Sequence, residues 1–208
     1  MISNKNHTVM DWPEGLDGNS FSGVARLANA SPRGARAAEI LDRHRLLDCL
    51  AAYQPEIVGT LPLAIDTPES DIDILCNVPD LAAFSEFSDR VLGHFDGYGL
   101  HQRPATSHVA AAVVVRFECE GLPVEIFATN CPTRSQYGFV HMLVEARILF
   151  VMGDEFASQV RALKQDGTKT EPAFARLLGL SGDPYIELAE LVSLSPPQLC
   201  QRLGVSGN

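Results

Sequence analysis

Apolar positions recur at three- and four-residue steps through much of the chain, and this spacing is typical of helices that bury one face. The pattern predicts helices over residues 34–53, 81–95, 136–152 and 156–164. Three further helices near the C-terminus are indicated by their start signals. These are Thr170 before Glu171-Pro172, Asp183 before Pro184, and Ser195 before Pro196 with Gln198 as a capping box.

Two parts of the chain show the shorter period of strands. Residues 56–59 form a brief apolar run, and residues 71–76 begin with strict alternation of polar and apolar side chains. Residues 108–119 and 122–128 are rich in β-branched residues and are joined by Glu120-Gly121, so they predict a hairpin. Between the first two strands, residues 61–70 contain two prolines and are expected to form a loop.

This order of elements predicts an α+β fold, in which a mixed sheet flanked by helices is followed by a helical C-terminal part. Residues 1–33 lack a clear period and are expected to form an irregular arm that Trp12 pins to the body. We expect the α/β core to span residues 34–132 and the helical part residues 133–208.

The charge balance changes the picture of the partners. The chain of 208 residues has 16 Lys and Arg against 26 Asp and Glu, a formal net charge of −10. A polynucleotide-binding surface needs a basic footprint, so nucleic acid is an unlikely partner, whereas a nucleotide can arrive with metal ions. The longest apolar run, residues 109–115, is too short for a membrane span. Five cysteines without paired spacing indicate reduced thiols and a cytoplasmic protein.

The chemistry is concentrated around Asp71 and Asp73. Carboxylates at positions i and i+2 of a strand project from the same face and can share divalent cations, and Mg²⁺ typically takes one or two carboxylates together with substrate phosphates. Gly59 permits close approach of a phosphate to the backbone, and Thr60 adds a hydroxyl beside it.

A third acid is expected from Glu125, which stands alone in the apolar strand of residues 122–128. If this strand lies beside that of Asp71 and Asp73, three acids converge on one site. The alternative is that all three are solvent-facing acids on a half-exposed sheet.

The succession of Gly59-Thr60, a loop, and Ser70-Asp71-Ile72-Asp73 resembles the signature of the nucleotidyltransferase superfamily of the DNA polymerase β type. Most of the chain after about residue 35 also resembles, more closely, a bacterial family that is catalogued as a domain of unknown function and classed as nucleotidyltransferase-like. The segments that carry this closer resemblance are residues 58–62, 70–74, 124–127, 169–174, 177–180 and 182–185, with His141, Glu145 and Arg147.

The resemblance implies Mg²⁺- or Mn²⁺-dependent transfer of a nucleotidyl group from a nucleoside triphosphate to a hydroxyl of a small-molecule or protein acceptor. Asp71, Asp73 and Glu125 would then be the catalytic metal ligands, with Glu125 as metal ligand or general base. The residues expected at the phosphates or the acceptor are Gly59, Thr60, Ser70, His141, Arg147 and Lys169.

Other features limit this reading. We expect Lys164 to be a solvated surface charge. The loop Leu61-Pro62-Leu63-Ala64 stands where many superfamily members carry Arg and Gly. This loop favours the alternative of a catalytically degenerate module that binds a nucleotide or a protein partner. The sequence leaves a homodimer open.

Overall fold

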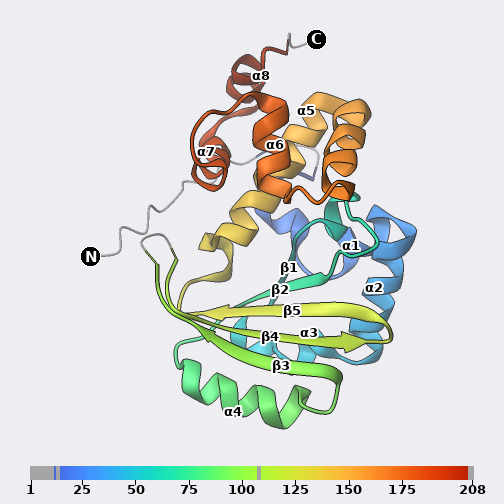
Figure 1. Ribbon diagram of the computed structural model, residues 1–208, viewed down its shortest axis with the longest axis vertical. Helices are drawn as coiled ribbons and strands as arrows, with labels where there is room; N and C mark the ends of the chain where they lie inside the picture. The colour runs from blue at the N-terminus through green and yellow to red at the C-terminus, as the bar shows by residue number, and fades with distance from the viewer. Residues whose placement is uncertain (1–11, 13–14, 107–108, 206–208) are drawn as a thin grey trace.

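The computed structural model describes residues 12, 15–106 and 109–205 as a five-stranded sheet covered by helices (Figure 1). The sheet order is β1-β2-β5-β4-β3, and the pairing of β2 with β5 is parallel whereas the other pairings are antiparallel. The strands are β1 (Glu56–Val58), β2 (Ile72–Asn77), β3 (Asp96–Arg103), β4 (Ala112–Cys119) and β5 (Leu122–Thr129). The sheet is therefore mixed, as the α+β prediction requires.

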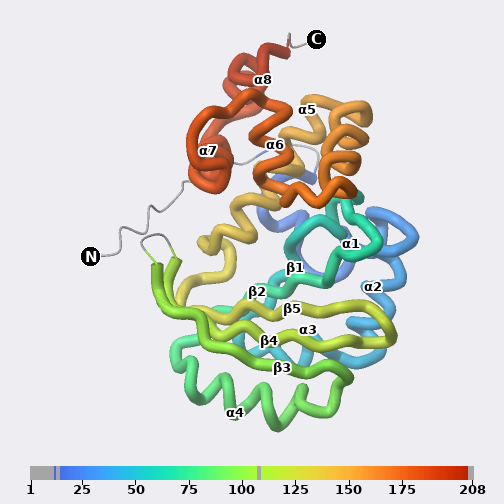
Figure 2. The backbone as a smooth tube through the Cα atoms, viewed as in Figure 1, coloured from blue at the N-terminus to red at the C-terminus, as the bar shows by residue number. Residues whose placement is uncertain are grey.

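The helices cover both faces of this sheet. They are α1 (Ala25–Ala30), α2 (Pro32–Arg43), α3 (Leu46–Cys49), α4 (Leu81–Leu92), α5 (Tyr137–Gln165), α6 (Thr170–Leu178), α7 (Pro184–Glu190) and α8 (Pro196–Leu203). Short 3-10 helices are η1 (Gly18–Phe21), η2 (Ala51–Tyr53), η3 (Leu61–Leu63), η4 (Thr133–Ser135) and η5 (Leu191–Ser193). Helices α2, α3 and α4 bury one face of the sheet, and α5 covers part of the other together with the C-terminal helices. The backbone trace shows the C-terminal helices α6, α7 and α8 on one side of the sheet and α4 on the other (Figure 2).

Alternation along the strands separates two cores. Ile74 of β2 and Ile126 of β5 lie in the core with α2 and α4, whereas Leu75 and Phe127, one residue further on, pack on the side of α5. Successive strand residues point to opposite faces, so every odd-numbered residue of this stretch of β2 and β5 faces α5. The acids at positions 73 and 125 belong to this odd-numbered set.

The hairpin prediction is confirmed, but one strand was not expected. Glu120 and Gly121 both have positive φ, 50° and 77°, as the tight turn between β4 and β5 requires. Strand β3 lies where we expected only the end of a helix, broken by Gly97 and Gly99. Its side chains are mostly exposed on an edge, so the apolar alternation that identifies a half-buried strand is missing.

Helix boundaries differ from the predictions where the backbone turns left-handed. The helix expected over residues 34–53 is divided, because Arg45 has a φ of 52° between α2 and α3. Helix α5 is interrupted at Gly153, whose φ is 77°. This break lies between the two helices predicted over residues 136–152 and 156–164, so that prediction is confirmed. Thr170 is the first residue of α6 and Lys169 its N-cap, so that start was predicted one residue too late. Asp183 and Ser195 cap α7 and α8 as expected.

The expectation of an irregular N-terminal arm is wrong for its described residues. They form η1 and α1, and the side chains of Phe21 and Leu27 are buried in the two cores. Trp12 does hold this segment to the body, because its Nε1 donates to the carbonyl of Leu194 at 2.9 Å. The apolar residues of this segment each fill a separate gap, so they show no period along the sequence.

Arg147 of α5 ties the two ends of the chain together. Its side chain is fully buried, its Nε donates to Leu16 O at 3.2 Å, and its Nη1 donates to Val192 O at 2.8 Å. The guanidinium also lies 5.0 Å from the centre of the Trp12 ring. A buried charge is tolerated only when its donors are satisfied, and here backbone carbonyls from both ends of the chain contribute.

In the part of the chain that the structure describes, each helix is too short or too polar to cross a membrane.

We expect Arg147→Ala to lower the free energy of unfolding by about 3 kcal/mol, because it leaves the two carbonyls unpaired and opens a cavity beside Trp12. Urea denaturation measures this loss. The matched control is Arg202→Ala on the exposed side of α8, which should stay within about 0.5 kcal/mol of the parent. Equal effects of the two substitutions would show that Arg147 does not join the ends of the chain.

Candidate functional site

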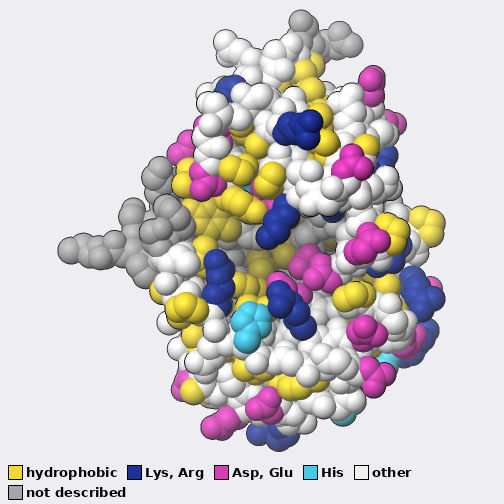
Figure 3. Space-filling model, in the orientation of Figure 1, with side chains coloured by type: hydrophobic (Ala, Val, Ile, Leu, Met, Phe, Trp, Pro, Cys, Tyr) yellow, Lys and Arg dark blue, Asp and Glu magenta, His cyan; other side chains and the backbone are white. Residues whose placement is uncertain are grey.

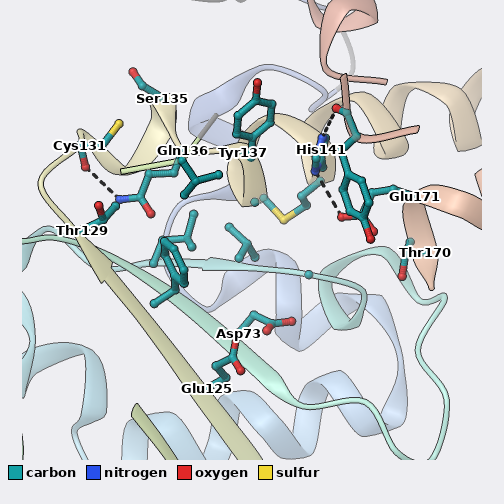
Figure 4. A pocket seen from close by; sticks show the side chains of 18 of the residues that line it. Asp73, Glu125, Thr129, Cys131, Ser135, Gln136, Tyr137, His141, Thr170 and Glu171 are labelled. Carbon is teal, nitrogen blue, oxygen red and sulfur yellow. Dashed lines mark hydrogen bonds and ion pairs between the residues drawn. The ribbon is translucent and has the colours of Figure 1, made fainter. Parts of the chain in front are cut away.

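The sheet register places Asp73 beside Glu125. The two are direct partners in the parallel pairing of β2 and β5, and both belong to the set that faces α5. Between this face and the C-terminal helices lies a cavity of about 720 Å³, lined by both acids (Figure 4). The surface is hollowed at this place, with acidic, basic and apolar side chains around the hollow (Figure 3). The expectation that Glu125 lies on a strand next to Asp73 is confirmed.

Gly59 makes room for the carboxylate of Asp73. Gly59 has a φ of 81°, and a Cβ on it would lie 2.1 Å from Asp73 Oδ2. No non-bonded pair of heavy atoms comes so close, so a side chain at position 59 would displace the carboxylate. Gly59 therefore serves Asp73 in two ways, through its backbone conformation and through its missing side chain.

Asp73 lies in an excess of negative charge. Burial raises the pKa of Asp73 well above its usual range, and the charges of Asp71 and Glu125 raise it further. The charge of Lys164 acts in the opposite direction. The ionised form of such a carboxyl group is disfavoured unless a cation binds to it and offsets the repulsion.

The interpretation of Lys164 as a solvated surface charge is wrong. Its ammonium group is partly buried, and burial lowers its pKa, although the charges of Glu145, Asp66, Asp73 and Glu171 act to raise it. One cation therefore faces four carboxylates. The interruption at Gly153 separates Lys164 from the helical period of the first half of α5, so the sequence pattern gave no sign of this placement.

Glu125 has a strong partner in Arg116, which sequence reasoning missed. Arg116 Nε donates to Glu125 Oε2 at 2.6 Å, and its Nη2 forms an ion pair with the same oxygen. The two residues are opposite each other in the β4–β5 pairing. Because a two-residue turn at Glu120-Gly121 fixes the register of a hairpin, this pairing could have been predicted from the sequence.

The expected convergence of three metal-ligating acids is not present as a preformed cluster. Among residues 12, 15–106 and 109–205, no three His, Cys, Asp or Glu side chains are arranged to hold a metal ion. Asp73 and Glu125 line the cavity, whereas Asp71 precedes β2 and acts on Asp73 through its charge. The Asp73–Glu125 pair still fits Mg²⁺, which needs only one or two protein carboxylates when phosphates and water complete its shell.

The wall opposite the sheet is built on helices α5, α6 and α7. His141 Nε2 lies 2.8 Å from the carbonyl of Tyr185, and its Nδ1 lies 3.3 Å from Glu171 Oε1 (Figure 4). A carbonyl only accepts, so Nε2 carries a proton and donates it. Burial acts to raise the pKa of Glu171, but the hydrogen bond and charge of His141 hold that pKa below its usual value.

Glu145 lies one turn after His141 on the same face of α5 and also lines the cavity. Its side chain is only 3% exposed. Burial raises the pKa of Glu145 well above its usual range, and the charge of Glu171 adds to this, whereas Lys164 opposes it. The four-residue spacing of His141 and Glu145 puts both on one face of the helix.

The other predicted phosphate-binding residues are spread over three places. Thr60 lines the cavity beside Gly59, and its hydroxyl lies 3.4 Å from Ser70 Oγ. Ser70 fixes the loop before β2, because its Oγ accepts from the Thr67 N–H at 2.9 Å and its carbonyl accepts from Arg33 Nη2 at 2.7 Å. Lys169 is exposed at the start of α6 and does not line the cavity.

Arg147 does not belong to the site, contrary to the prediction. It is buried between the chain ends and does not line the cavity, so the expectation that it contacts a phosphate is wrong. A fully buried Arg and a phosphate-binding Arg have the same helical spacing in a sequence, so the pattern did not distinguish them.

The far end of the cavity is less polar. Phe127, Tyr137 and Met142 line it together with Gln136. Gln136 Nε2 donates to Cys76 O at 3.0 Å and to Cys131 O at 2.9 Å, which fixes the start of α5 against the sheet (Figure 4). The cavity therefore has an acidic end at Asp73 and an apolar end that can accept a flat ring.

Comparison with known families gives one match. The family described as domain of unknown function DUF4269 matches residues 39–191, about three quarters of the chain. None of the curated proteins compared matches the chain.

Several solved structures are similar to this chain at low identity. The GLD-2/RNP-8 complex is 11% identical over 77% of this chain and 60% of that chain, with a TM-score of 0.48. A cytoplasmic RNA terminal U-transferase is 15% identical over 77% and 48%, with a TM-score of 0.47, and mtPAP in complex with UTP is 12% identical over 77% and 36%, with a TM-score of 0.44. The chain thus spans 36–60% of the length of these three structures.

We expect Gly59→Ala to destabilise the protein by about 1–3 kcal/mol more than Gly97→Ala. Both glycines have positive φ, 81° and 64°, but a Cβ at position 97 meets no atom within 4 Å, whereas one at position 59 collides with Asp73. Urea denaturation of both variants isolates the collision from the backbone penalty. Equal losses would contradict the close contact between Gly59 and Asp73.

We expect the free energy of unfolding to decrease less steeply with rising pH in Glu145→Gln than in the parent. The folded protein keeps a proton on Glu145 that the unfolded chain releases above its ordinary pKa of 4.5, so stability decreases as the pH rises from there towards the raised pKa. A neutral glutamine removes this dependence, so the variant should gain stability relative to the parent between pH 4.5 and 8. Denaturation at several pH values tests this, with exposed Glu155→Gln as the control.

Proposed function

This chain belongs to the family described as domain of unknown function DUF4269, and we propose that it is a Mg²⁺-dependent nucleotidyltransferase. It would move a nucleotidyl group from a nucleoside triphosphate to a hydroxyl of a small-molecule or protein acceptor. The observation that carries this proposal is the carboxylate of Asp73 lying against the bare backbone of Gly59, beside Glu125 and at the acidic end of a cavity.

Asp73 and Glu125 would hold Mg²⁺, and the charge of Asp71 would add to the attraction for the cation. The charge of the site supports this fit. Asp73 is buried and is repelled by Asp71 and Glu125, so a bound cation would stabilise its ionised form. When bound, Mg²⁺ supplies charge neutralisation for the phosphates and lowers the pKa of the acceptor hydroxyl. Mn²⁺ takes similar oxygen ligands and should substitute for it.

The triphosphate would lie against Gly59 and Thr60. The missing side chain of Gly59 leaves its backbone accessible to phosphate oxygens, and the Thr60 hydroxyl offers a donor next to it. Lys164 would offset the charge that develops on the leaving pyrophosphate, as fixed cations do in phosphoryl-type transfer. Phe127, which also lines the cavity, would contact the base.

The chemical step needs one proton acceptor. The acceptor oxygen attacks the α-phosphorus, its proton passes to the Glu125 carboxylate, and the bond from the α-phosphorus to the bridging oxygen breaks to release pyrophosphate. Arg116 must loosen its hold on Glu125 or shift with it, because the same carboxylate oxygen accepts from the guanidinium in this structure. Until then the ion pair with Arg116 holds the Glu125 carboxylate in place.

The net charge of −10 supports a small-molecule or protein acceptor over a polynucleotide. Among the described residues all five cysteines are free thiols, and we place the protein in the cytoplasm on this ground.

A second candidate function is nucleotide binding without transfer. It is favoured by η3, where Leu61 and Pro62 are buried and offer no cation to a phosphate, and by the ion pair that occupies Glu125. The same fold would then report nucleotide levels to a protein partner. Binding of a nucleotide without release of pyrophosphate distinguishes this function from catalysis.

We expect pyrophosphate release and labelling of an acceptor when the protein is incubated with labelled nucleoside triphosphates and Mg²⁺ or Mn²⁺. Asp73→Asn should lower the rate about a hundredfold or more, because the site loses the charge that holds the metal. Asp42→Asn, on the exposed face of α2, is the matched control and should leave the rate unchanged. If no nucleoside triphosphate binds with metal in calorimetry, both functions are excluded.

A further inference from the structure

The cavity carries more acids than a metal site on the sheet uses. Asp73 and Glu125 lie on the sheet, whereas Glu145 lies on α5 and Glu171 on α6. We call the helical side of the cavity, formed by Glu145 and Glu171 with Tyr137, His141 and Tyr185, the helix wall. Figure 4 shows Glu171 and His141 on this wall, with Asp73 and Glu125 on the opposite side of the cavity. Nucleotidyl transfer at the sheet gives no role to Glu145 or Glu171.

Glu145 is a buried acid on the cavity side of the helix wall. It is 97% enclosed, lines the cavity, and has no hydrogen bond or ion pair to any residue that the structure describes. A buried carboxyl group without partners is costly, and the cost is removed by a donor that enters from the cavity. Glu171 is better served, because the His141 ring lies 3.3 Å from its carboxylate and lowers its pKa.

The negative charge of the helix wall favours a positively charged ligand. Lys164 interacts with Glu145, Glu171, Asp66 and Asp73. Asp66 also pairs with Arg33 at 3.7 Å and Glu171 with His141 at 3.3 Å, so Glu145 and Asp73 are the acids for which Lys164 matters most. A triphosphate bound on the sheet side would draw Lys164 towards itself and leave Glu145 without a cation. A second phosphate or carboxylate would be repelled at this wall, whereas a cation would be attracted.

The shape and lining of the helix wall favour an ammonium group over a bare metal ion. Tyr137 and Tyr185 line the same stretch, with ring centres 5.4 and 5.9 Å from that of His141, and aromatic faces attract ammonium groups. A primary ammonium has three donors, which match the free carboxylate oxygens of Glu145 and Glu171.

We propose that Glu145 and Glu171 bind a primary ammonium group, and that the acceptor of the reaction is a small hydroxylated amine. The first half of this inference concerns binding alone, and the second half rests on the proposed nucleotidyltransferase function. The amine would anchor the acceptor on the helix wall and direct its hydroxyl across the cavity towards Asp73 and Glu125.

Calorimetry with matched pairs of small molecules tests the amine site. The probes are glucosamine against glucose, and 1,4-diaminobutane against 1,4-butanediol, so that the members of each pair differ in the amine. We expect each amine to bind at least tenfold more tightly than its neutral counterpart. Equal binding of the members of both pairs, or no binding of any probe, would overturn the inference.

Variants locate the binding. Glu145→Gln should reduce the preference for the amine to less than threefold, and Glu171→Gln should weaken it as a second, independent substitution. Glu155→Gln, exposed on the same helix, should keep the full preference. A preference that persists unchanged in both Glu145→Gln and Glu171→Gln would place amine binding elsewhere and contradict the proposal.

The same samples, titrated with nucleoside triphosphate and Mg²⁺, separate the two proposals. Nucleotide binding without preference for amines would overturn the amine site and leave the nucleotidyltransferase function standing. Amine preference without nucleotide binding would support the helix wall as an amine site and exclude the nucleotidyl chemistry.

Discussion

The contact between the Asp73 carboxylate and the backbone of Gly59 is the constraint on which the site depends. The carboxylate occupies the space where any other residue would carry its Cβ, so strands β1 and β2 can place an acid at the floor of the cavity only with glycine at position 59. The parallel pairing of β2 with β5 then fixes Glu125 beside it. Two acids are thereby held together by backbone geometry, whatever their mutual repulsion.

That repulsion shapes the rest of the cavity. Asp73 and Glu145 both have raised pKa values because burial and neighbouring acids disfavour their anions. Lys164 faces both of them but carries only one charge. A protein that keeps buried acids with too few cations is less stable than it could be, and such a cost is typical of a site that completes its charge with a ligand. A metal with phosphates at the sheet and an ammonium group at the helix wall would satisfy the two sets of acids separately.

Much of this site could be predicted from local sequence pattern. The period-two alternation placed Asp73 on one face of its strand, and the hairpin at Glu120-Gly121 placed Glu125 on a neighbouring strand. The same turn also fixes Arg116 opposite Glu125. What could not be predicted depends on contacts between distant segments. Arg147 binds carbonyls contributed by Leu16 and Val192, and Lys164 reaches the acids only because α5 changes course at Gly153. Strand β3 is an exposed edge without alternation, so its sequence does not differ from that of a loop.

The central claim is that Asp73, lying against Gly59, holds a divalent cation for a triphosphate. The most direct measurement is the paramagnetic resonance of Mn²⁺ titrated into the protein with a non-hydrolysable nucleoside triphosphate analogue. Our account predicts bound Mn²⁺ that depends on the nucleotide, disappears in Asp73→Asn and is strongly weakened in Gly59→Ala, while Asp42→Asn binds as the parent does. Mn²⁺ binding that is unchanged in Asp73→Asn would contradict the account.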